Sequence, residues 1–170
     1  MTTTYFKIPQ GYIARNPGVA SMSTAQAIAK TYYKIELDNF DAVSTEPEET
    51  RYPPELFFGI VEQDENPPEG AEIFQLFREP LEWFLALCGK FKLSVVEGLV
   101  SDHPYFQSQL RFRATKVFAF PKQLKEFQTA TGLTNFPKVN VGEANVAITP
   151  EEKLEVLIKY KLDFDFYKGL

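Results

Sequence analysis

Five basic side chains, set among aromatic residues between positions 109 and 125, are the strongest candidates for chemistry in this sequence. The segment reads QLRFRATKVFAFPKQLK, and its basic residues are Arg111, Arg113, Lys116, Lys122 and Lys125. Basic groups bind phosphates and rings stack on unpaired bases, so this composition is typical of a surface that holds single-stranded nucleic acid. The same charges would also serve to meet an acidic partner protein, or the acidic loops of a second copy of this chain.

The spacing within this segment favours partner binding over nucleic-acid binding. On a strand, Arg111 and Arg113 share one face, whereas Leu110 and Phe112 share the other. Bases stack only on rings that face the solvent, and here the apolar side is the one expected to face the core. We therefore expect the basic side chains to be exposed and most of the rings to be buried.

Residues able to act as nucleophile or base are few and poorly placed. Ser101, Asp102 and His103 are the residue types of a catalytic triad, but neighbouring side chains of an extended segment point in opposite directions. A turn ending at Pro104, with Asp102 as its capping residue, explains the same residues. Cys88 lies on the apolar face of an expected helix, which indicates a buried thiol.

The carboxylates offer only a weak site for a metal or for acid–base catalysis. Asp163 and Asp165 share one face of an expected strand, about 7 Å apart, which would permit a Mg²⁺ or Ca²⁺ site but is more typical of a solvated face. No glycine-rich phosphate motif, HExxH or EF-hand spacing occurs in the sequence. We therefore expect no catalytic residue, no metal and no cofactor.

The composition indicates one folded domain over residues 1–170. Of these residues 44% are hydrophobic and 24% are charged, as in an ordinary globular protein. The net charge of −5 opposes a general attraction to phosphates or anionic lipid, and no apolar run reaches the roughly 18 residues of a membrane span. With one cysteine and no secretory pattern, we expect a soluble protein of the cytoplasm that has no membrane partner.

Hydrophobic periodicity predicts an α+β fold, with a mostly antiparallel, twisted sheet of about five strands and two or three helices packed on it. The expected strands lie near residues 31–37, 91–99, 109–120, 139–148 and 154–167. The expected helices lie near residues 23–29, 71–88 with a break at Pro80, and 121–131. An irregular arm at 1–20, with one strand-like piece at Tyr5 to Ile8, and acidic, proline-rich loops at 44–54 and 63–70 complete the chain.

Two signals conflict after Thr149. Every even position from Leu154 to Phe166 is apolar, which predicts a strand. The residues Thr149-Pro150-Glu151-Glu152 are nevertheless a good helix start, with a capping threonine, a first-turn proline and an acid three residues after the cap. We prefer the strand and keep a helix through Lys161 as the alternative.

Together these patterns predict a non-catalytic protein-interaction or assembly protein that acts through strand edges and an aromatic or charged surface. Its expected partner is another protein or a second copy of the chain. The first alternative is a single-stranded nucleic-acid-binding protein that uses residues 109–125. The second is a small enzyme whose carboxylates are gathered only by the fold.

Overall fold

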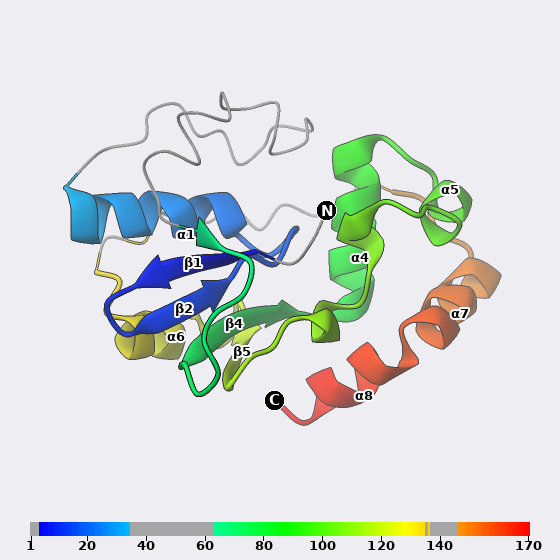
Figure 1. Cartoon of the computed structure of the whole chain (residues 1–170). Helices are drawn as coiled ribbons and strands as arrows, with labels where there is room; N and C mark the ends of the chain where they lie inside the picture. Colours follow the sequence, from blue (N-terminus) through cyan, green and yellow to red (C-terminus); the bar gives the residue numbers. More distant parts are fainter. Residues whose placement is uncertain (1–3, 35–62, 135, 137–145) are drawn as a thin grey trace.

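A mixed β-sheet forms the centre of the computed structural model, which describes residues 4–34, 63–134, 136 and 146–170 (Figure 1). Its strands are β1 (Tyr5–Ile8), β2 (Gly11–Ala14), β3 (Gln63–Asp64), β4 (Ile73–Arg78) and β5 (Lys116–Phe120). They lie in the order β3-β1-β2-β4-β5. The pairs β3/β1 and β1/β2 are antiparallel, whereas β2/β4 and β4/β5 are parallel. The α+β class is therefore correct, but the sheet is not mostly antiparallel.

Helices occupy the connections that parallel strands require, because a tight hairpin joins only antiparallel strands. The helices are α1 (Ser21–Ile28), α4 (Pro80–Phe91), α5 (Val95–Leu99), α6 (Leu124–Thr131), α7 (Pro150–Lys159) and α8 (Lys161–Lys168). A π-helical turn, η1 (Ala29–Tyr33), extends α1, and two 3₁₀ turns are η2 (Pro104–Phe106) and η3 (Gln109–Arg111). Helix α1 lies between β2 and β4 in the chain, and α4 and α5 lie between β4 and β5.

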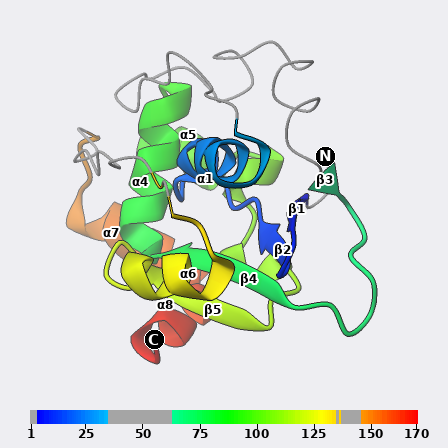
Figure 2. The same cartoon turned by 90° about the vertical axis from the view of Figure 1, so that its left-hand side faces the viewer.

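The two faces of β4 pack against different elements, so all six residues of this strand are buried. Phe74 and Leu76 belong to the main core, which also holds buried residues of α1, α4, α6 and α7. On the other face, Phe77 packs against Phe166 of α8, with ring centroids 5.0 Å apart. Helices α1 and α8 accordingly lie on opposite sides of β4 and β5 (Figure 2).

The expected helix at 71–88 is wrong before Pro80 and correct after it. A short apolar run fits a buried parallel strand as well as it fits a helix, and here residues 73–78 form β4. Helix α4 begins at Pro80, as the proline at the break predicted, with the side chain of Glu79 accepting a hydrogen bond from the backbone N–H of Glu82. It ends at Phe91, with Lys92 in the left-handed conformation.

Other expected strands are helical where the structure describes them. Residues 31–33 lie in η1, residues 91–99 cover the end of α4 and all of α5, and residues 154–167 lie in α7 and α8. Capping boxes join Ser94 to Glu97 and Thr149 to Glu152, and they favour a helix in both segments. The helical alternative after Thr149 is therefore correct. In the expected strand at 109–120, only β5 is a strand and the first half contains η3.

The N-terminal residues form a β-hairpin of β1 and β2, where we expected an irregular arm with one strand-like piece. Gly11 makes the turn possible, because residues with a side chain rarely adopt its φ of 143° and because its backbone lies close to Glu72. A Cβ there would lie 2.2 Å from the carbonyl oxygen of Glu72.

The remaining expectations have mixed outcomes. The helices expected at 23–29 and 121–131 are present as α1 and α6, and Gly132 ends α6 at φ 74°. Residues 65–70 form the expected loop, after the short strand β3. The loop at 44–54 and most of the strand at 139–148 lie outside the described residues, so one domain over 1–170 stays a prediction. No described helix is long and apolar enough to span a membrane.

Candidate protein-interaction surface

Four large aliphatic side chains are exposed between residues 154 and 162, on α7 and at the start of α8. Leu154, Leu157, Ile158 and Leu162 are 57%, 44%, 65% and 71% exposed. We call these four residues the C-terminal apolar face. Single exposed leucines are ordinary on protein surfaces, whereas a contiguous apolar group is typical of a contact site.

Helical spacing explains why α7 has an apolar outer side as well as an apolar inner side. Leu154, Leu157 and Ile158 are three and four residues apart, so they share the outer side. Val156 and Tyr160 lie on the inner side and are buried. A helix that is apolar on both sides is usually covered on both, and in the described part of the chain only the inner side of α7 is covered.

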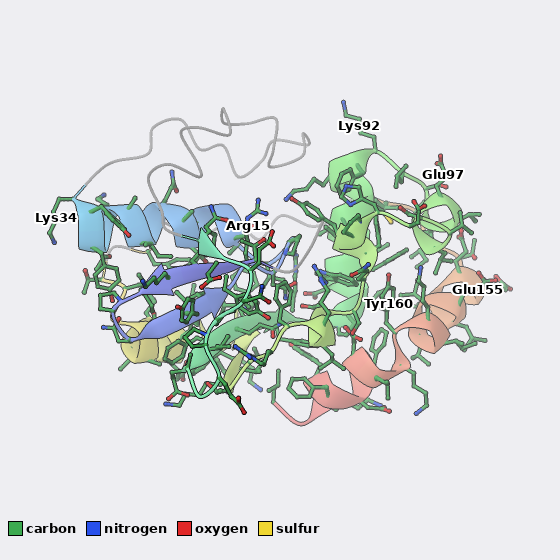
Figure 3. The ribbon with its side chains drawn as sticks, viewed as in Figure 1. Arg15, Lys34, Lys92, Glu97, Glu155 and Tyr160 are labelled. Carbon is green, nitrogen blue, oxygen red and sulfur yellow. The ribbon has the colours of Figure 1, made fainter. Side chains whose placement is uncertain are left out.

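The inner side of α7 is anchored by aromatic packing on α4. The Tyr160 ring lies 5.1 Å from Trp83 and 5.8 Å from Phe84, measured between centroids. Its hydroxyl donates a hydrogen bond of 2.5 Å to the carbonyl oxygen of Phe106, and burial raises the pKa of this phenol. In Figure 3 the Tyr160 side chain points toward the body of the molecule, whereas Glu155 points away from it.

Helix α8 is anchored by Asp163, which is 1% exposed. Its carboxylate accepts hydrogen bonds from the Ser108 hydroxyl at 2.6 Å and from the backbone N–H of Gln109 at 2.9 Å. Burial raises the pKa of Asp163, and these two hydrogen bonds oppose that rise. The carboxylate therefore joins α8 to the start of η3.

Gln109 continues this connection into the sheet. Its side-chain oxygen accepts hydrogen bonds from the backbone N–H of Arg78 and from Asn16 Nδ2, at 3.0 and 2.9 Å. Its side-chain nitrogen donates to the carbonyl oxygen of Arg78 at 2.8 Å. Helix α8 is thus connected through Asp163 and Gln109 to the end of β4 by a chain of hydrogen bonds.

Charged residues are distributed unevenly along the exposed side of α7 and α8. Glu151, Lys153 and Glu155 are exposed in the first part of α7, and Lys159, Lys161 and Asp165 are exposed from the end of α7 onward. Lys161 Nζ lies 2.9 Å from the carboxylate of Asp165, one helical turn later. The exposed surface is consequently more acidic at its beginning and more basic near its middle.

The structure divides the five basic residues expected to bind a partner into two kinds. Arg111 Nη1 donates to the carbonyl oxygens of Gln107 and Ser108 at 2.7 and 2.9 Å, and the guanidinium lies 4.5 Å from the centroid of the Phe112 ring. Burial lowers the pKa of Arg111 to about 10, an effect that the Asp163 carboxylate opposes. This side chain stabilises its own segment.

The other four basic residues are more exposed than Arg111 and have other contacts. Arg113 donates to the carbonyl oxygens of Pro67 and Pro68, and Lys116 Nζ lies 3.5 Å from the Glu72 carboxylate. The two exposed lysines Lys122 and Lys125 lie before and within α6.

The rings of this segment face the interior. Phe112 and Phe120 are 6% and 2% exposed, and Phe118 packs edge-on against Phe127 at 5.8 Å. Phe112 and Phe120 are therefore too deeply buried to stack on bases, and Phe118 is half-buried.

The serine, histidine and cysteine candidates have structural roles. The Ser101 hydroxyl accepts a hydrogen bond from the backbone N–H of His103, and His103 Nδ1 accepts one from the backbone N–H of Tyr105, both at 3.2 Å. These hydrogen bonds support the turn interpretation. The capping residues are Ser101 and His103, whereas we had expected Asp102. Cys88 is fully buried, and burial raises the pKa of its thiol to about 12.

Asp163 and Asp165 do not share a face, because the segment is a helix and not a strand. Asp163 is buried against Ser108, whereas Asp165 is exposed beside Lys161. Among the described residues, no three His, Cys, Asp or Glu side chains are grouped so as to hold a metal.

The sequence interpretation did not identify the C-terminal apolar face, although the signal for it was present. The capping box at Thr149 and Glu152 places α7, and helical spacing from there separates Leu154 and Ile158 from Val156 and Tyr160. Comparison of the chain with protein-family models, curated proteins and solved structures gave no match.

Proposed function

We propose that this protein is a non-catalytic interaction or assembly protein and that the C-terminal apolar face is its contact surface. The observation that carries the proposal is the exposure of four large aliphatic side chains on helices whose inner sides are anchored. Burying one such side chain is worth about 1.5–3 kcal/mol, so a partner that covers all four gains a large part of its binding free energy there.

The strand edges that we expected to serve this role are less suitable. Among the described strands, β3 and β5 are the edges of the sheet, and β3 has two residues. Strand β5 begins with Lys116, and the backbone N–H of Ala119 already donates to the Gln123 side chain at 2.7 Å. Short strands and lysines are typical of edges protected from strand addition, which favours the helical surface.

Nucleic-acid binding receives less support from the geometry. The guanidinium groups of Arg111 and Arg113 donate to backbone carbonyls, and a phosphate would have to compete with these contacts. Stacking on Phe112 or Phe120 would require these buried rings to leave the core.

The test compares capture of partners by the wild-type protein and by the triple variant L154S/I158S/L162S. Both are tagged and used with the host's lysate after nuclease treatment, and bound proteins are identified by mass spectrometry. We expect partners to be captured by the wild type and lost with the triple variant, because the apolar contact is removed while the fold is kept.

The matched control is K122A/K125A, which changes two exposed side chains outside the C-terminal apolar face and should keep the partners. Circular dichroism and thermal unfolding check that all three proteins are folded. Equal capture by the wild type and by a folded triple variant would contradict the proposal.

A further inference from the structure

We infer that α7 and α8 undock from α4 and the sheet as one unit, and that the C-terminal apolar face exists only while the two helices are docked. This inference rests on the proposed function and adds a way in which the contact surface is controlled. Proteins open locally where few apolar side chains are buried, and such openings require less free energy than global unfolding.

Few side chains of α7 and α8 are buried. Of residues 150–168, all of which the structure describes, only Val156, Tyr160 and Asp163 are buried, and one of these is a carboxylate. Other apolar contacts are partial, as for Phe166, which lies against Phe77 of β4 and is 38% exposed. By contrast, five of the twelve residues of α4 are buried. The hydrophobic contribution that holds α7 and α8 in place is therefore small for their length.

Hydrogen bonds add to this limited apolar contact. The Tyr160 hydroxyl donates to the carbonyl oxygen of Phe106 at 2.5 Å. The Asp163 carboxylate accepts hydrogen bonds from the Ser108 hydroxyl and from the backbone N–H of Gln109. Tyr160 is the residue between α7 and α8, and Asp163 lies in the first turn of α8. These contacts therefore hold both helices at their junction, so we expect the two helices to dock and undock together.

Docking is also what keeps α7 and α8 helical. The two helices have 10 and 8 residues, and isolated helices shorter than about 12–15 residues are marginal in water. The C-terminal apolar face consists of side chains at helical spacing, so it loses its arrangement when the helices undock. The fraction of docked molecules consequently sets the apparent affinity for a partner.

Hydrogen exchange of backbone amides, followed by NMR, tests the undocking. In the wild type we expect amides of α7 and α8 to exchange about 100-fold or more faster than amides of β4, which exchange only on global unfolding. Asp163→Asn should speed exchange about tenfold in both helices, because it weakens a charged acceptor at their junction. The matched control Asp165→Asn changes an exposed carboxylate of α8 and should leave exchange in α7 unchanged.

Two results of this experiment overturn the inference. The first is equal exchange of α7, α8 and β4 in the wild type, because the helices then open only when the whole protein unfolds. The second is a change confined to α8 in Asp163→Asn, because the two helices are then not one unit.

The variant V156A/Y160F/D163N tests whether the contact surface depends on docking. It changes all three buried residues of α7, α8 and their junction, so we expect undocked helices and at least a tenfold loss of partner capture. Trp83 is the only tryptophan and its ring lies 5.1 Å from that of Tyr160, so its fluorescence should shift to longer wavelength. Slow exchange in β4 checks that the sheet is folded. Full capture by a variant that these measurements show to be undocked overturns the inference.

The results also separate this inference from the proposed function. Uniform exchange, together with capture that is lost in L154S/I158S/L162S, keeps the proposed function and overturns the undocking. Fast exchange of α7 and α8, together with unchanged capture by L154S/I158S/L162S, keeps the undocking and overturns the proposed function. If V156A/Y160F/D163N does not fold, exchange in the wild type and in Asp163→Asn decides whether the helices undock.

Discussion

Helices α4 and α7 begin in the same way and have different surroundings. Each has a proline in its first turn, after a residue whose side chain accepts a hydrogen bond from the backbone of the third helical residue. In α4, the side chains of Trp83, Phe84 and Leu87 are all fully buried. In α7, Val156 is buried while Leu154 and Ile158 are more than half exposed.

This comparison shows that the start of a helix and its coverage have separate causes. Capping is a local interaction, set by a few neighbouring residues. Whether the side chains of a helix are buried depends on which other parts of the chain pack against it. The apolar side chains of α4 are used in folding, whereas those on the outer side of α7 are available for binding, and the four predictions below test this division.

The largest expected effect is a loss of stability on truncation inside the covered helix. Trp83→Ala should lower the free energy of unfolding by about 3–5 kcal/mol, because it leaves a cavity beside Tyr160 and removes the indole hydrogen bond to the carbonyl oxygen of Pro17. Urea unfolding followed by circular dichroism measures this loss. A loss of less than about 1 kcal/mol in the free energy of unfolding would contradict our description of α4 as a buried helix that packs against α7.

Asp163→Asn should have the next largest effect, about 1–3 kcal/mol near neutral pH, because it weakens the acceptors of the Ser108 and Gln109 hydrogen bonds. The pKa of Asp163 is raised in the folded state, so the folded protein holds this proton more tightly than the unfolded chain does. The wild type should therefore lose stability relative to the variant as the pH rises from about 3.8 through the raised pKa.

Asp165 provides the matched control, because its pKa is lowered, first by the hydrogen bond from Lys161. Its contribution to stability is present above its ordinary pKa of 3.8 and is lost as the pH falls through the lowered value. Urea unfolding between pH 3 and pH 7 should thus give opposite trends for Asp163→Asn and Asp165→Asn, each relative to the wild type. Trends of the same sign would contradict a structure in which the Asp163 carboxylate is buried and the Asp165 carboxylate is exposed.

Arg111→Ala should cost about 1 kcal/mol or somewhat more, since its guanidinium is hydrogen-bonded to the carbonyl oxygens of Gln107 and Ser108. Lys125→Ala should cost almost nothing, because Lys125 is exposed on α6. Thermal unfolding of the two variants tests this difference. Binding of single-stranded nucleic acid at low salt that both substitutions weaken equally would argue for a phosphate-binding surface instead.

The smallest expected change in stability belongs to the C-terminal apolar face. Leu154→Ser and Ile158→Ser should each change the free energy of unfolding by no more than about 0.5 kcal/mol, because the altered side chains are exposed. The same variants should lose partner capture. A destabilisation of about 2 kcal/mol or more for either variant would mean that the face is covered in the folded chain and would contradict its role in binding.

The sequence predicted the local starts and stops of helices better than it predicted strands. Pro80 before α4 and Gly132 after α6 mark boundaries through backbone geometry alone, so they can be recognised without knowledge of the fold. Strand β4 was mistaken for a helix because burial on both faces removes the alternation that identifies a strand.

The candidate site was missed for a related reason. Helices α7 and α8 carry apolar residues on both the inner and the outer side, and α7 ends at Lys159. These two features together turn a helical pattern into an apparent alternation from Leu154 to Phe166. The misleading pattern therefore arises from the exposed apolar side chains that suggest a contact surface, and only the fold shows which of them remain uncovered.

The separation of inner and outer residues on α7 also bears on how this protein can change in evolution. Val156 and Tyr160 are buried in the core, whereas Leu154 and Ile158 are more than half exposed. Substitutions at exposed positions usually cost little stability, so the outer side can change without a loss of folded protein. The outer surface of such a helix is therefore able to change while the architecture that supports it is kept.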